Sequence, residues 1–124
     1  MTITLATLEK ATAQEVYSQV RNHLLTQGRK SERWRKDEQL RNIALCVYHS
    51  EDGTSCAAGC LIADEEYSES FEGDSWGGLV RRGWVPDTHC ALIERLQMIH
   101  DSFPPADWLF SLDYLAQEFD LIPV

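Results

Sequence analysis

The sequence lacks both a long hydrophobic run and an export signal. No stretch of its 124 residues approaches the roughly 18 consecutive apolar residues of a membrane helix. Its first residues carry no basic start, and Glu9 and Lys10 interrupt any signal-peptide core. These absences argue against a membrane protein and predict a cytoplasmic location. The length fits one domain, which we expect to span residues 1–124.

Basic residues are also scarce. The chain has 11 Lys and Arg residues against 20 Asp and Glu residues, for a net charge of −9. This balance argues against general nucleic-acid binding, which needs cationic side chains to neutralise phosphates. Residues 1–50 carry a net +3 and residues 51–124 a net −12. Such an acidic half favours a partner with a basic surface, while the alternative is an acidic surface that only keeps the protein soluble.

Familiar catalytic and cofactor-binding motifs are missing. The chain has no G-x-S-x-G and no H-E-x-x-H, and its glycines match neither of the spacings that cradle phosphates. We therefore predict no cofactor and favour a binding protein over an enzyme, although the sequence leaves the question of an enzyme open.

The N-terminal half shows two periodic stretches. Thr12 and Glu15 have the spacing of a capping box, and the apolar residues that follow recur at helical spacing, so we predict a helix over residues 13–27. Residues 42–50 alternate as in a strand, with a turn leading to a short return strand at residues 54–56. The basic segment at residues 29–41 lies between this helix and the strand at residues 42–50. We expect it to be an exposed connection or short helix, with the side chain of Trp34 packed in the core.

The second half predicts a C-terminal helix pair. Residues 56–62 suit a tightly packed turn, and residues 63–78 a loop with helical fragments. A helix follows Pro86, with Asp87 or Thr88 as its cap, and another begins at Pro105. The predicted fold class is α+β, a mostly helical single domain with one small antiparallel β-hairpin and a C-terminal αα-hairpin.

Four cysteines could bear chemistry. In a reducing compartment they should not form structural disulfides, and we favour buried core cysteines. The alternative is a zinc site that uses Cys56 and Cys60, whose spacing is not that of a zinc finger or ribbon. A nucleophilic Cys60 would need an activating base, and His49 is the only imidazole expected nearby.

An acidic segment with interleaved aromatic residues is the main candidate contact face. Carboxylates speed encounter with a basic partner, and aromatic side chains are frequent anchors of interfaces. The alternatives are a solvated loop, or carboxylates at positions 64–66 that bind Mg²⁺ or act in hydrolysis. The predicted partner-binding residues are Asp64, Glu65, Glu66, Tyr67, Phe71, Trp76 and Trp84.

Arg81 and Arg82 are the one basic feature within this acidic region. They could bind a phosphate or carboxylate beside the rings of Trp76 and Trp84, as in a pocket for a nucleotide or another small anion. The alternative, which we favour, is that they pair with nearby acidic side chains of the same chain.

A segment of the chain resembles a group of small uncharacterised bacterial and phage proteins. The shared pattern is Asp-Gly, Cys-Ala-x-Gly-x-Leu-Ile, Asp-Glu-x-Tyr and Glu-Gly, which stand here at residues 52–53, 56–62, 64–67 and 72–73. Ala63 replaces the proline that usually precedes the Asp-Glu pair. The resemblance implies an accessory protein of phage or mobile-element type, a kind that often binds and blocks a host protein.

Three functions follow as hypotheses. The first is a non-enzymatic protein whose acidic face binds, and inhibits, a host or cognate protein with a basic surface. The second is a small-molecule or nucleotide-binding protein that uses Arg81, Arg82 and tryptophans. The third is a small enzyme that uses Cys60 or the carboxylates at positions 64–66.

Overall fold

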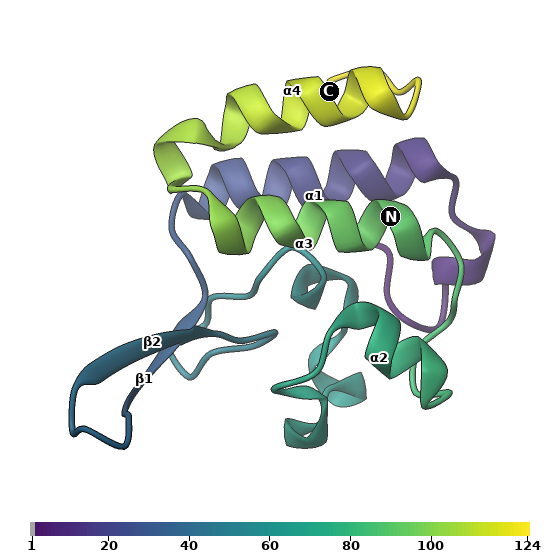
Figure 1. Cartoon of the computed structure of the whole chain (residues 1–124). Helices are drawn as coiled ribbons and strands as arrows, with labels where there is room; N and C mark the ends of the chain where they lie inside the picture. The colour runs from purple at the N-terminus through teal and green to yellow at the C-terminus, as the bar shows by residue number, and fades with distance from the viewer. Residues whose placement is uncertain (1) are drawn as a thin grey trace.

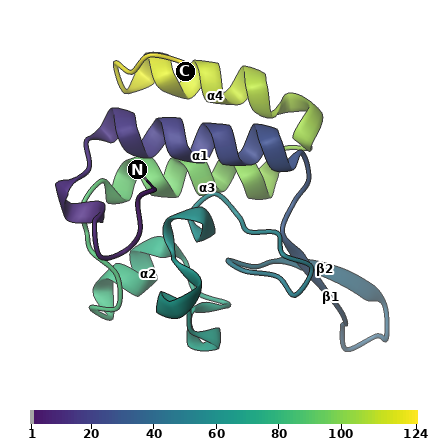
Figure 2. The same ribbon diagram turned by 180° about the vertical axis from the view of Figure 1, so that it is seen from behind.

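A computed structural model describes residues 2–124 (Figures 1 and 2). Three helices form its larger part: α1 (Ala13–Gln27), α3 (Cys90–Ser102) and α4 (Trp108–Glu118) pack against one another, with α3 and α4 as a helical hairpin. The short helix α2 (Trp76–Arg81) lies against α3. The strands β1 (Glu32–Lys36) and β2 (Asn42–Cys46) form a two-stranded antiparallel sheet. The predicted fold class is confirmed.

Helix α1 begins and ends where the sequence indicates. The Thr12 side chain accepts a hydrogen bond from the Glu15 amide, and the Glu15 side chain accepts one from the Thr12 amide, so the predicted capping box is present. Gly28 ends the helix in the left-handed region, at φ 68°. The predicted bounds of 13–27 are confirmed.

The predicted hairpin has the wrong partner strand. β2 pairs with the basic segment that precedes it, with Trp34 opposite Ala44, and not with residues 54–56. The later turn makes one isolated bridge, between His49 and Ser55. Trp34 is also not pinned to the core, because 66% of it is exposed. The prediction failed because β1 has one aromatic residue among four charged ones, and so lacks the alternation of apolar and polar residues that indicates a strand.

β1 and β2 project from the body as an arm, which we define as residues 32–46 (Figures 1 and 2). Both of its outer edges are unpaired within the described chain, since the sheet has two strands. The last three residues of β1, at positions 34–36, are all exposed. An isolated two-stranded sheet is marginal in stability, so the arm depends on its base for support.

The first helix of the C-terminal pair starts without the predicted cap. Its N-cap is His89, in the left-handed region at φ 58°, and neither Asp87 nor Thr88 caps it. His89 Nε2 instead contacts the Ala11 carbonyl oxygen at 2.7 Å, which ties the start of α3 to the start of α1. This bond positions the helix start but does not cap it, since no side chain accepts from the first-turn amides of α3.

The core lies between the three long helices and the middle of the chain. Tyr17, fully buried, donates from its hydroxyl to the Leu112 carbonyl at 2.8 Å, which joins α1 to α4. The buried Trp108 ring stacks on His100 of α3, with centroids 5.5 Å apart. No helix among residues 2–124 is long and apolar enough to cross a membrane.

The loop with helical fragments predicted at residues 63–78 is present as far as residue 75, and its last three residues begin α2 instead. The strand predicted at residues 42–50 ends earlier, at Cys46. Residues 47–75 contain neither an α-helix nor a strand. They contain three short 3₁₀ turns, Gly59–Leu61, Asp64–Glu66 and Glu69–Phe71. The first turn packs tightly, because a Cβ atom added to Gly59 would lie 2.0 Å from the Tyr48 carbonyl oxygen. Only a glycine allows the two backbones to come so close.

We expect Gly59→Ala to lower the free energy of unfolding by about 3 kcal/mol, since the new methyl group must push the Tyr48 backbone aside. Gly28→Ala is the matched control, because Gly28 has a positive φ but no atom within 4 Å of an added Cβ. It should cost about 1 kcal/mol. Urea unfolding of both variants measures the difference, and equal losses would show that the close approach at Gly59 is unimportant.

Candidate functional site

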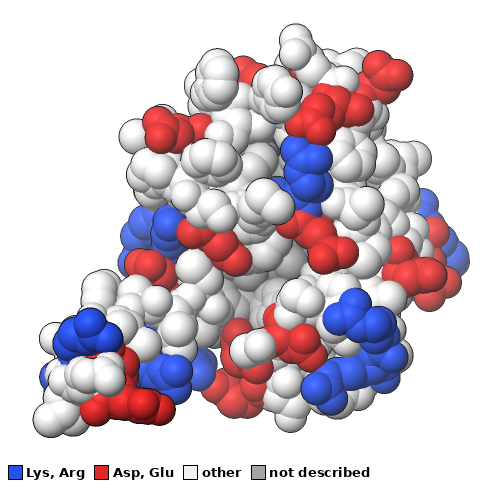
Figure 3. Space-filling model, in the orientation of Figure 1, with Lys and Arg blue, Asp and Glu red and all other residues white. Residues whose placement is uncertain are grey.

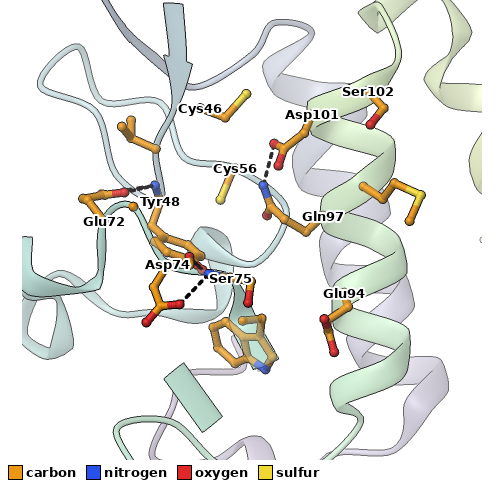
Figure 4. Close-up of a pocket in the computed structure, with 14 residues that line it drawn as sticks. Cys46, Tyr48, Cys56, Glu72, Asp74, Ser75, Glu94, Gln97, Asp101 and Ser102 are labelled. Atoms are coloured by element: carbon orange, nitrogen blue, oxygen red, sulfur yellow. Dashed lines mark hydrogen bonds between the residues drawn. The ribbon is translucent and has the colours of Figure 1, made fainter. Parts of the chain in front are cut away.

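A pocket of about 410 Å³ lies between the end of β2, residues 72–76 and helix α3 (Figure 4). Figure 3 shows acidic side chains on both sides of a hollow below α3. Apolar groups and carboxylates both line it. The side chains used below are Cys46, Tyr48, Glu72, Asp74, Trp76, Glu94, Gln97, Met98 and Asp101.

One wall of the pocket is a single face of α3. Glu94, Gln97, Met98 and Asp101 are spaced by three, one and three residues, so they follow one another along the helix surface. Gln97 accepts a hydrogen bond from the Ala58 amide at 2.9 Å and donates one to Asp101 at 2.7 Å. Gln97 therefore fixes the helix to the packed turn and holds the Asp101 carboxylate in place.

Glu72 forms the opposite wall. Its carboxylate accepts a hydrogen bond from the Tyr48 amide at 2.9 Å and another from the Tyr67 hydroxyl. Next to it, Asp74 forms an ion pair with Arg82 at 2.8 Å, and this contact lowers the pKa of Asp74. Glu72 is thus held by neutral donors, whereas the charge of Asp74 is compensated.

Three carboxylates at the pocket make no ion pair with Lys or Arg in the described part of the chain: Glu72, Glu94 and Asp101. Glu94 contacts only the Cys90 thiol among the hydrogen bonds of its side chain, at 3.3 Å. Lys30 reaches Asp101, but it donates to the backbone carbonyl. None of the residues that line the pocket is a Lys or Arg, so its charge attracts cations.

Trp76 contributes an unpaired donor. The side chain lines the pocket although only 1% of the residue is exposed. Its Nε1 is buried and has no hydrogen-bond partner among residues 2–124. A buried N–H group of this kind usually has an acceptor, so Trp76 is an exception among the described residues.

Cys46, His100 and Asp101 bring three possible metal-ligand atoms within 4.8 Å of one another. The hydrogen bonds of His100 argue against a metal here. The Ser31 amide donates to Nε2 at 3.0 Å, so Nε2 carries no proton and the proton lies on Nδ1, which contacts Asp101 at 2.8 Å. A metal on Nδ1 would leave the ring with no proton at all, which makes the trio a structural cluster.

The predicted zinc pair is not arranged for a metal. Cys56 Sγ accepts from the Gly59 amide at 3.3 Å, and Cys60 Sγ donates to the Ala57 carbonyl at 3.2 Å. Neither belongs to a group of three possible ligands among the described residues. Burial raises the pKa of the Cys60 thiol to about 12, which opposes a role as nucleophile.

The predicted acidic cluster is divided in its roles. Asp64 and Glu65 are exposed. Glu66 is half-buried, and its carboxylate accepts hydrogen bonds from the amides of Leu5 and Ala6, both at 2.9 Å. Glu66 therefore tethers the N-terminal segment and cannot freely offer its carboxylate to a partner.

The four predicted aromatic anchors also differ. Phe71 and Trp76 are buried, with 6% and 1% exposed, so they are core side chains and not surface anchors. Tyr67 is half-buried and stacks on His49 at 4.5 Å between centroids. Trp84 is 43% exposed, with the Arg82 guanidinium 5.1 Å from its ring centroid. Tyr67, Phe71 and Trp84 lie next to one another, with ring centroids 6.2 Å and 6.0 Å apart, but Phe71 is buried between the other two and Trp76 lies in the core.

The predicted anion-binding pair is not assembled. Arg82 is bound to Asp74 and covers Trp84, as the intramolecular alternative expected, and Arg81 is exposed. Trp76 lies in the core instead of beside them. No convergent pocket for a phosphate follows from this arrangement.

Sequence reasoning missed the pocket. Glu94 and Asp101 are not among the predicted site residues, because the apolar stripe is the stronger pattern of the same helix. The signal was present, since the spacing of Glu94, Gln97, Met98 and Asp101 puts them on a second face of the helix.

Comparison of the chain with protein-family models, curated proteins and solved structures gave no match.

We expect the native cysteines to resist alkylation at neutral pH. Burial, reinforced at Cys46 by the nearby Asp101 carboxylate, raises the pKa of Cys46 to about 12, the same value as for Cys60. The rate of carbamidomethylation, followed by mass spectrometry, should rise with pH and reach no plateau below about pH 10. Protein unfolded in urea is the control and should react quickly. A plateau near neutral pH at Cys60 would revive its role as a nucleophile.

Proposed function

We propose that this chain is a non-enzymatic binding protein whose acidic pocket holds a basic segment of a partner protein. The observation that carries the proposal is the set of uncompensated carboxylates, Glu72, Glu94 and Asp101, around a pocket that no Lys or Arg lines. A Lys or Arg side chain that entered would gain these charges at a partly desolvated site, where they count for more than at an open surface.

A peptide segment fits the pocket better than a bare cation. The carboxylates need a positive group, and apolar side chains line the pocket beside them. A polypeptide supplies both, because the charged end of a Lys or Arg side chain can face Glu94 and Asp101 while its methylene stem contacts an apolar surface. Met98, 52% exposed, offers an apolar surface for the methylene stem of that side chain.

The surface beside the pocket extends this preference. An apolar groove of about 450 Å³ lies between α3 and α4, and Met98 lines both the groove and the pocket. Phe103, Phe110 and Tyr114, which line the groove, are 41%, 78% and 58% exposed. A partner segment that carries an aromatic side chain near its cation would contact both the pocket and the groove. Aromatic side chains are frequent at the centres of interfaces.

This proposal keeps the class of function predicted from the sequence but moves the contact residues. The acidic half still faces a basic partner, with the pocket in place of the cluster at positions 64–66. A phage or mobile-element accessory protein that inhibits a host or cognate protein is the form of the proposal that the sequence resemblance suggests. The high thiol pKa of Cys60 and the ion pair of Arg82 support neither an enzyme nor a nucleotide-binding protein.

Binding of fluorescein-labelled octa-arginine, followed by anisotropy, tests the pocket. We expect the unmodified protein to bind the peptide, with affinity falling as salt rises. Glu94→Lys should weaken binding at least about fivefold, because it places a cation where the peptide cation would lie. Glu94 is exposed and its one side-chain bond is to a thiol, so the fold should survive.

Glu65→Lys is the matched control. It changes the net charge by the same amount at an exposed position outside the pocket. Long-range attraction should fall equally in both variants, so any excess loss in Glu94→Lys reports the pocket itself. Equal losses would mean nonspecific attraction to an acidic protein, and a larger loss in Glu65→Lys would return the site to the cluster at positions 64–66.

A further inference from the structure

We infer that the segment that the pocket accepts is the arm of a second copy of this chain, so that two copies exchange arms. This inference rests on the proposed function, since it names the partner of the same pocket. The chain itself contains a basic segment with an exposed tryptophan, and it projects from the body (Figures 1 and 2). The arguments are charge, surface chemistry and geometry.

The charge of the chain is divided between the arm region and the rest. The arm, residues 32–46, carries a net +1, while the other residues carry a net −10. Within β1, Arg35 and Lys36 are exposed and form no ion pair in the described chain, and Lys36 bonds only the neutral Asn42 side chain, at 2.9 Å. These two cations are free to pair with carboxylates of another molecule, and the acidic pocket of a second copy supplies such carboxylates.

The exposed face of β1 matches the acidic pocket together with the apolar groove beside it. Trp34 and Lys36 are two residues apart on one strand, so their side chains lie on the same face, about 7 Å apart. The acidic pocket and the apolar groove are likewise neighbours, since Met98 lines both. Lys36 can therefore reach Glu94 of a second copy while Trp34 packs against Met98 and the groove.

Trp34 is costly to leave in water. It is 66% exposed, and its strand lies in a sheet of two strands. Burying a tryptophan contributes a large apolar area, and tryptophan and arginine are the most frequent anchors of interfaces. The arm thus has the composition of an interface and, within one described chain, no surface to cover it.

The position of the arm permits a closed pair. β2 ends at Cys46, and Cys46 also lines the pocket, so each arm starts at the edge of its own pocket. Two copies related by a twofold axis near this edge can each lay an arm across the other. The contact is then made twice, which closes the assembly as a dimer and leaves no open end.

Sedimentation equilibrium with a reciprocal charge exchange tests the inference. The unmodified chain should form dimers. Lys36→Glu places a carboxylate against the acidic pocket, and Glu94→Lys places a cation against the basic arm, so each variant alone should associate at least about tenfold more weakly. An equimolar mixture of the two should recover dimers, because every arm then meets a pocket of opposite charge. Trp34→Ala should also dissociate the dimer without changing any charge.

The controls separate the two proposals. Glu65→Lys should remain dimeric, and its mixture with Lys36→Glu should not gain dimers. A monomeric unmodified chain that still binds octa-arginine through Glu94 would overturn arm exchange and leave an external basic protein as the occupant. A dimer that persists in both single variants would overturn it as well. Failure of both dimerisation and pocket-dependent peptide binding would remove the proposed function too.

Discussion

The fold depends on satisfying the backbone of a buried segment that has almost no regular structure. Residues 47–75 lie against the helices, yet they lack the hydrogen bonds that a helix or sheet would give them. Side chains supply these bonds: Gln97 accepts from Ala58, Glu72 accepts from Tyr48, and His23 lies 2.8 Å from the Ser55 carbonyl. Polar side chains of α1 and α3, together with Glu72 of the segment itself, thus hold the middle of the chain.

This requirement explains which parts of the fold could be predicted from the sequence. The ends of α1 follow from local chemistry, since Thr12 and Glu15 cap each other and Gly28 adopts a positive φ. The pairing of β2 could not be predicted in the same way, because Trp34 and its charged neighbours show no apolar alternation. The fragmentary character of residues 63–78 could be expected from their composition, but not the distant side chains that hold them.

The same contrast applies to the site. Consecutive acidic residues and interleaved aromatic residues predict a contact face at positions 64–76. In the fold, however, Glu66 binds backbone amides of the N-terminal segment and Trp76 is a buried core side chain. The carboxylates that remain free, such as Glu94, come from a helix face whose polar pattern looks like an ordinary solvated surface. Whether a carboxylate accepts hydrogen bonds from backbone amides depends on contacts between residues far apart in the sequence. A local sequence pattern cannot show such contacts.

The double role of Cys46 has a consequence for how the surface can change. Because this residue both ends β2 and lines the pocket, the base of the arm is part of the pocket wall. A substitution at Cys46 therefore bears on the arm and on the pocket at once, because the same backbone position belongs to both.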